Sequence, residues 1–157
     1  MSFCSHSRSY TNKKTNINID MKQDYDENTF NGRLRKSRIE NNISIQDLAS
    51  MIGVTKSLVS AYEVGRYFPN IGILNKIGKY FDMDYLCRDG YSNLVWNNEC
   101  FIENLRSWIN SNNFSKYEVA KLLGVSSSTF KYWFEGSVMS MTTYNKIKNN
   151  LTKYKLI

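Results

Sequence analysis

The chain has 157 residues, of which 41% are hydrophobic and one is proline, with a net charge of +7 and an isoelectric point near 9.3. This length allows one medium or two small domains, and the low glycine and proline content argues against a turn-rich β-sandwich. The basic excess favours an anionic partner, most simply the phosphates of a nucleic acid.

Several classes of site are excluded by what the sequence lacks. Cys4, Cys87 and Cys100, with His6 as the only histidine, match no zinc-site spacing, and three cysteines do not make a disulfide framework. No nucleophile, base and acid can be assembled around one histidine, so we expect no catalytic residues, no metal and no cofactor. No apolar stretch is long enough to span a bilayer. We therefore expect an all-α protein of the cytoplasm that does not associate with a membrane.

Residues 1–29 have no apolar period and are rich in serine, asparagine, aspartate and lysine. We predict a flexible, disordered N-terminal arm. Alternatively, the arm follows a DNA groove through Arg8, Lys13 and Lys14. From Phe30 the spacing changes to that of an amphipathic helix, whose outer face is expected to carry Arg33, Arg35, Lys36 and Arg38.

The segment from Ser44 to Arg66 has the pattern of two short helices joined by a tight turn. Ser44 caps the first helix, with Asp47 close to its free backbone amides, and Gly53 stands where that helix must end and reverse. Thr55 caps a second helix that runs from Lys56 to about Glu63. In that helix Val59 and Tyr62 are expected to face inward, and the outward positions are Lys56, Ser57, Ser60 and Ala61.

A further helix capped by Asn70 and a short last helix at 82–86 complete five helices in residues 30–86. This segment resembles the Cro/CI-type (lambda-repressor-like) helix-turn-helix family. The resemblance extends over Leu34, Arg35, Ser44, Leu48, Ala49, Gly53, Val54, Ser57, Val59, Ser60, Glu63, Gly65, Pro69 and Leu86. It implies a five-helix DNA-binding domain in which the loop 66–70 lies against the phosphate backbone.

We predict that the second helix of this motif enters the major groove and presents its outward side chains to base edges. Lys56 can donate to guanine or reach a phosphate, Ser57 and Ser60 can bond to bases or phosphates, and Ala61 can touch a thymine methyl group. Arg66, Tyr67 and Asn70 are expected to hold phosphates. The family often has a phosphate-contacting glutamine at the position that Ile45 occupies here. Gln46, one residue later, is its nearest equivalent and is counted among the expected DNA-binding residues.

The chain then repeats itself, because residues 101–136 align with residues 30–65 without a gap. Matching caps and turn glycines predict a second helix-turn-helix-like domain in residues 101–157. Its outward positions are Ser127, Ser128, Lys131 and Tyr132, next to Phe134. The polar residues suit DNA and the aromatic residues suit a protein partner, so both remain open. Residues 87–100 are expected to be a linker that docks on one domain through Trp96.

Together these features predict two tandem small helical bundles, each built on a helix-turn-helix. The expected function is that of a sequence-specific regulator of transcription that binds double-stranded DNA as a repressor. One recognition helix contacts only a few base pairs, so useful specificity requires a second DNA-contacting helix. A homodimer on an inverted repeat, which the family favours, or the second unit of the same chain can supply it. The alternative is an inhibitor that binds a protein target, since phage and plasmid proteins resembling this family include anti-CRISPR proteins and antitoxins that also repress their own operon.

Overall fold

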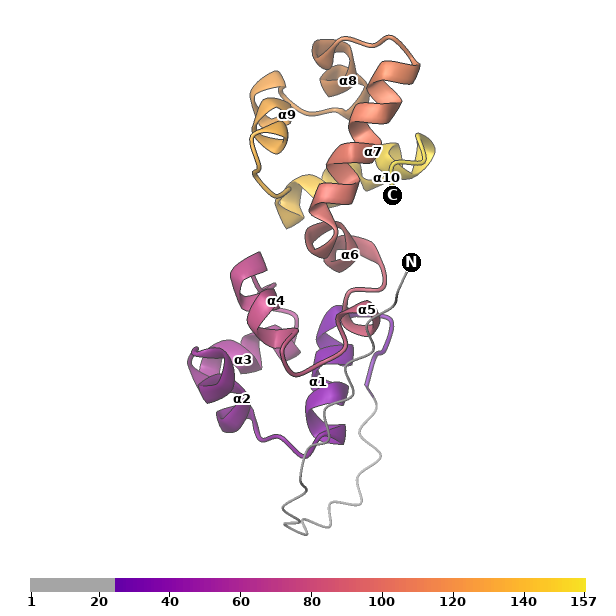
Figure 1. Cartoon of the computed structure of the whole chain (residues 1–157). Coiled ribbons are helices and arrows are strands. Elements are labelled where there is room, and N and C mark those ends of the chain that lie inside the picture. Colours follow the sequence, from indigo (N-terminus) through magenta and orange to yellow (C-terminus); the bar gives the residue numbers. More distant parts are fainter. Residues whose placement is uncertain (1–24) are drawn as a thin grey trace, which may run out of the picture.

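The computed structural model describes residues 25–157, and within that range all regular structure is helical (Figure 1). This confirms the all-α fold predicted from the sequence. The first five helices are α1 (Phe30–Glu40), α2 (Ile45–Ile52), α3 (Lys56–Glu63), α4 (Ile71–Ile77) and α5 (Met83–Leu86). The next five are α6 (Gly90–Trp96), α7 (Asn98–Ser111), α8 (Lys116–Leu123), α9 (Ser127–Phe134) and α10 (Met141–Lys153).

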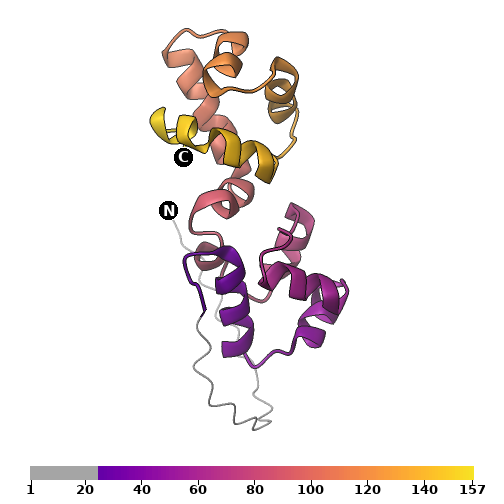
Figure 2. The same ribbon diagram turned by 180° about the vertical axis from the view of Figure 1, so that it is seen from behind.

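The helices form two bundles stacked end to end, with α6 between them (Figures 1 and 2). We call α1–α5 the first unit and α7–α10 the second unit. The core of the first unit includes Leu34, Leu48, Ile52, Val59, Leu74, Ile77 and Leu86. The core of the second includes Phe101, Leu105, Val119, Leu123, Phe130, Trp133, Ile147 and Leu151.

Local structure in the two units follows the same plan. Helices α8 and α9 begin and end at the positions that align with the ends of α2 and α3. Three pairs of aligned residues share a positive φ, namely Asn42 and Asn113, Gly53 and Gly124, and Gly65 and Gly136. Each helix of these motifs has a side-chain cap, from Ser44, Thr55, Ser115 and Ser126. Short-range interactions therefore place the same turns at the same points of both segments.

The expected basic face of α1 is wrong for two of its four residues. Arg33 is fully buried and Arg38 is 8% exposed, whereas Arg35 and Lys36 are half-buried. Arg33 and Arg38 lie on the inward stripe of α1, beside Leu34. Burial of a charged side chain costs several kcal/mol unless it is paired and hydrogen-bonded, so each arginine requires partners in the interior.

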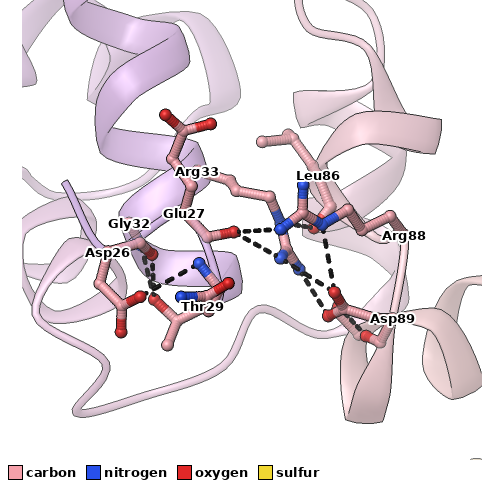
Figure 3. Close-up of polar contacts among 10 residues, drawn as sticks. Asp26, Glu27, Thr29, Gly32, Arg33, Leu86, Arg88 and Asp89 are labelled. Carbon is pink, nitrogen blue, oxygen red and sulfur yellow. Dashed lines mark hydrogen bonds and ion pairs between the residues drawn. The ribbon is translucent and has the colours of Figure 1, made fainter.

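Arg33 finds its partners at both ends of the first unit (Figure 3). Its Nε donates to the carbonyl oxygen of Leu86 at 3.0 Å, and its Nη1 donates to that of Glu27 at 3.0 Å. Its Nη2 pairs with Asp89 Oδ1 at 3.1 Å. Asp89 stands at the start of α6 but does not cap it, because its carboxylate is held by Arg33 and Arg88. Arg33 thus ties α1 to the end of α5 and the beginning of α6.

The last residues of the expected arm pack on the first unit. Thr29 caps α1, and a Cβ at Gly32 would collide with the carbonyl oxygen of Asp26, so this close approach requires glycine. Hydrogen bonds from Lys36 and from the hydroxyl of Tyr85 lower the pKa of the Glu27 carboxyl. The other predicted arm contacts, through Arg8, Lys13 and Lys14, lie outside the described residues.

The expected linker contains a helix that packs on both units instead of on one. Residues 90–96 form α6, in which Leu94 belongs to the second core and Val95 to the first, while Trp96 is half-buried against the first. Successive residues of an α-helix point about 100° apart, so neighbouring side chains can enter different cores. The rest of the segment, from Asn98, is the first turn of α7.

We expect acid to weaken the N-terminus of α8. The carboxylate of Glu118 accepts a hydrogen bond from the backbone N–H of Ser115 at 2.8 Å and another from its hydroxyl at 2.7 Å, and these bonds lower the pKa of Glu118. A lowered pKa in the folded state means that the stabilisation is complete above the unfolded value and is lost as pH falls through the folded value. In Glu118→Gln the midpoint of thermal unfolding should therefore fall less between pH 7 and pH 3 than it does in the unchanged chain. Circular dichroism measures this midpoint.

Glu103→Gln is the matched control, since Glu103 lies exposed on α7 and makes no ion pair within residues 25–157. If the midpoint fell with pH in Glu118→Gln as steeply as in the unchanged chain, the capping role of Glu118 would be contradicted.

Candidate functional site

The turn between α2 and α3 is fixed by backbone geometry and by two caps. Ser44 accepts from the N–H of Asp47 at 3.0 Å, and Gly53 ends α2 in the left-handed conformation at φ 69°. The N–H of Val54 then donates to the carbonyl of Ala49 at 2.9 Å. Thr55 starts α3 by accepting from the N–H of Leu58 at 3.2 Å. The first turn of α3 therefore has one defined direction relative to α2.

Helix α3 has a buried side and a solvent side, largely as the sequence predicts. Val59 and Tyr62 are buried, whereas Lys56 and Ser57 are exposed and Ser60 is half-buried. Ala61 was expected to face outward, but it is 7% exposed. The loop after α3 folds back at this position, since the N–H groups of Arg66 and Tyr67 donate to the carbonyl of Ala61 at 2.9 and 3.3 Å. Ala61 is therefore not available to a ligand.

The C-terminal end of α3 is held by an ion pair that the sequence analysis did not identify. Arg38 of α1 donates to both carboxylate oxygens of Glu63, at 2.5 and 2.9 Å, and also to the carbonyl of Ile43 at 2.9 Å. The two side chains are 10% and 5% exposed. This bidentate pair connects α1, the turn before α2 and the last residue of α3, so it fixes how α3 lies on the unit.

The basic residues of the first unit divide into two groups. Arg33, Lys36 and Arg38 are engaged in ion pairs with Asp89, Glu27 and Glu63. The second group forms no ion pair within residues 25–157 and contains the half-buried Arg35 and the exposed Lys56, Arg66, Lys76 and Lys79. Positive charge that is free to meet an external anion therefore includes the start of α3 and the loop after it, as well as α4 and the residues that follow it.

The remaining residues predicted to bind DNA are exposed and lie near Lys56 and Arg66 in the sequence. Tyr67 is 62% exposed and Gln46 is exposed on the first turn of α2. Asn70 is exposed, but its Oδ1 caps α4 by accepting from the N–H of Ile73 at 3.0 Å, which leaves its Nδ2 as a donor. One cation was missed: Lys76 of α4 places Nζ 3.4 Å from the position that a Cβ would take at Gly53. Its charge lies near the negative end of α2.

Helix α9 places its outward residues as the alignment predicts. Ser127 and Ser128 are exposed and Tyr132 is 57% exposed, while Phe130 and Trp133 are buried. Lys131 pairs with Glu135 at 3.4 Å on the surface. Phe134 was expected to add exposed aromatic area, but it is half-buried against Phe130, with ring centroids 5.1 Å apart. The cations of Arg106 and Lys116 lie 5.5 and 4.9 Å from its ring centroid.

Other kinds of site find little support in the part of the chain that the structure describes. No group of three or more His, Cys, Asp or Glu side chains in residues 25–157 lies close enough together to hold a metal ion. Cys87 is buried, and burial raises the pKa of its thiol to about 12, so the thiol stays protonated at neutral pH. No helix among the described residues has the length and apolar character needed to cross a bilayer.

Comparison with known families gives a match over residues 31–85 to a model described as a helix-turn-helix domain. Residues 31–85 form a helix-turn-helix domain. The match covers α1 to α5 almost completely and includes the α2–turn–α3 segment described above. No curated protein and no solved structure matches the chain significantly.

Proposed function

We propose that the protein binds double-stranded DNA through α3 and regulates transcription as a repressor that blocks access to a promoter. The observation that supports this most directly is the exposed start of α3. Lys56 and Ser57 project from a helix whose other side is buried and whose two ends are held by Thr55 and by the Arg38–Glu63 pair. A rigid helix with donors at its N-terminal end suits the major groove of B-DNA.

In the proposed complex each residue type has a distinct role. Lys56 donates to the O6 and N7 acceptors of guanine, and Ser57 and Ser60 bond to base edges or to phosphates. Arg66 and Tyr67, with the Nδ2 group of Asn70, hold the phosphate backbone and so fix the orientation of α3. Phosphate contacts provide much of the affinity, and the residues of α3 provide the sequence preference.

We expect the triple variant Lys56→Ala, Ser57→Ala, Ser60→Ala to lose specific binding. Each lost base contact costs about 1–3 kcal/mol, so affinity for the preferred duplex should fall about a hundredfold or more. None of the three side chains is buried, so the fold should persist. The preferred duplex is obtained by selection from random sequences with the full chain, and affinity is then measured by fluorescence anisotropy at fixed salt.

Lys79→Ala is the matched control, since it removes one positive charge from the same unit at an exposed position beyond the end of α4. Its affinity for the selected duplex should remain close to that of the unchanged chain. If the triple variant bound the selected duplex as tightly as this control, α3 would not be the recognition element.

A second candidate function is supported by exposed aromatic area on the second unit. Tyr117 of α8 is 68% exposed and Tyr132 of α9 is 57% exposed, and exposed tyrosines are frequent at protein interfaces. In this alternative the protein is an inhibitor of the anti-CRISPR or antitoxin kind, with autorepression as a second activity. The triple variant separates the two functions, since inhibition of a protein target would survive the loss of DNA binding.

A further inference from the structure

The two units are joined through side chains that enter both cores. Helix α6 sends Leu94 into the second core and Val95 into the first, at 3% exposure each. Tyr91 is half-buried against both clusters. A connection buried on two sides in this way cannot act as a free tether, because rotating one unit would expose apolar surface from α6.

Contacts around Tyr91 bring together the loops that follow α3 and α9. Its hydroxyl donates to the carbonyl of Met139 at 2.9 Å. Its ring lies 5.0 Å from that of Phe68 and 5.5 Å from that of Tyr144, centroid to centroid. Val138, from the loop after α9, packs against the core of the first unit. A cleft of about 720 Å³ is lined by both loops, residues 65–70 and 138–140, and by Tyr91.

These loops occupy the same place in their units. Each follows the second helix of its motif and ends in the cap of the next helix, Asn70 for α4 and Ser140 for α10. Contact between the same surface of two similar subunits is the mark of an isologous, two-fold interface. Here the two surfaces belong to one chain.

The ribbon views agree with a two-fold arrangement. Helices α4 and α10 both face the middle of the molecule next to α6, whereas α2 and α8 lie on the sides of their units that face away from it (Figures 1 and 2). Helices α3 and α9 lie along the same edge, on the left in Figure 1 and on the right in Figure 2. Two-fold dimers of helix-turn-helix proteins bind inverted half-sites with helices placed along one side of the duplex.

We infer that one chain is an internal dimer, in which α3 and α9 together bind a single DNA site made of two unlike half-sites in inverted orientation. This inference rests on the proposed function of α3. The half-sites differ because the outward residues differ. Lysine is the first residue of α3, Lys56, and the fifth of α9, Lys131, while Ser57 and Ser128 occupy the same position. No second copy of the chain is then needed for specificity.

Selection from random duplexes with the full chain tests this directly. We expect an asymmetric, two-part motif and one chain per duplex by native mass spectrometry. Lys56→Ala should relax base preference in one half of the motif only, and Lys131→Ala should relax it in the other, each with about tenfold weaker binding to the selected duplex. Lys79→Ala should alter neither half.

Changing the spacing between the half-sites in the DNA tests whether α6 connects the two units rigidly, and it leaves the protein unchanged. Inserting five base pairs turns one half-site to the opposite side of the duplex, since one helical turn is about 10.5 base pairs. We expect affinity to fall about tenfold or more, whereas freely tethered units would tolerate the insertion.

The results that would contradict this inference differ from those that would contradict the proposed function. A palindromic motif bound by two chains, with preference changed by Lys56→Ala in both halves and by Lys131→Ala in neither, would overturn the internal dimer and leave DNA binding by α3 intact. Tolerance of the five-base-pair insertion would overturn the fixed arrangement of the units. Failure to select any preferred duplex would overturn the proposed function and the inference together.

Discussion

Replacing Glu63 by alanine is expected to destabilise the first unit by about 3–5 kcal/mol, because it leaves the buried guanidinium of Arg38 without its carboxylate. Small domains are stable by only about 5–15 kcal/mol, so this change removes a large part of the total. Hydrogen exchange of the amides of α1 and α3 measures the effect, since exchange reports local opening even when the second unit stays folded.

Two further variants isolate the cause. Glu40→Ala removes an exposed carboxylate from α1 and should change stability little, because its contact with Lys36 is a surface pair at 3.7 Å. The double variant Arg38→Met, Glu63→Leu removes both charges and should recover most of the loss, as replacement of buried pairs by apolar residues does elsewhere. A Glu63→Ala protein as protected as Glu40→Ala would refute the role given to the pair.

Arg33→Lys is expected to cost about 1–3 kcal/mol although it preserves the charge. A lysine ammonium cannot reproduce the planar set of donors that reaches Leu86, Glu27 and Asp89 at once. The half-exposed Asp89 can be rehydrated, and the carbonyl of Glu27 keeps its hydrogen bond from Arg88 at 2.7 Å, so we assign most of the cost to the buried carbonyl of Leu86, which is left unpaired. The unfolding midpoint in urea, followed by circular dichroism, measures the loss.

Because Leu86 and Asp89 lie just before α6, the same substitution should also loosen the connection between the units. Faster hydrogen exchange in α6 than in α9 would show this. Arg35→Lys is the matched control, since Arg35 lies on the same helix, is half-buried and makes no ion pair within residues 25–157. Equal midpoints for the two variants would mean that the hydrogen bonds of Arg33 contribute nothing measurable.

The buried arginines show how the sequence could have been interpreted further. Phe30, Arg33, Leu34, Ser37 and Arg38 have the spacing of one inward stripe, and all five are buried. A pattern that assigns every arginine to the surface does not predict this stripe. The partner carboxylates were harder to find, since Glu63 and Asp89 are 25 and 56 residues distant from their arginines. The burial of Ala61 is likewise not predicted by the helical pattern of α3, because it depends on the following loop, in which the N–H groups of Arg66 and Tyr67 donate to the carbonyl of Ala61.

What the sequence determined by itself is the local structure of both units. Caps at Ser44, Thr55, Ser115 and Ser126 act on backbone groups three residues away. The left-handed turn at Gly53 likewise depends on one residue and its neighbours. Interactions of such short range depend only on residues that are close together in the sequence. The helices and turns of the helix-turn-helix segment can therefore be predicted from the sequence pattern alone.

Only the tertiary structure decided which charges remain free and how the two units face each other. Pairing of Arg33 and Arg38 in the interior leaves Lys56 and Arg66 as available cations beside α3. Helix α6 was expected to be a linker, and its role follows from side chains that enter two cores at once. These outcomes depend on contacts between residues far apart in the chain, whose formation no local pattern specifies.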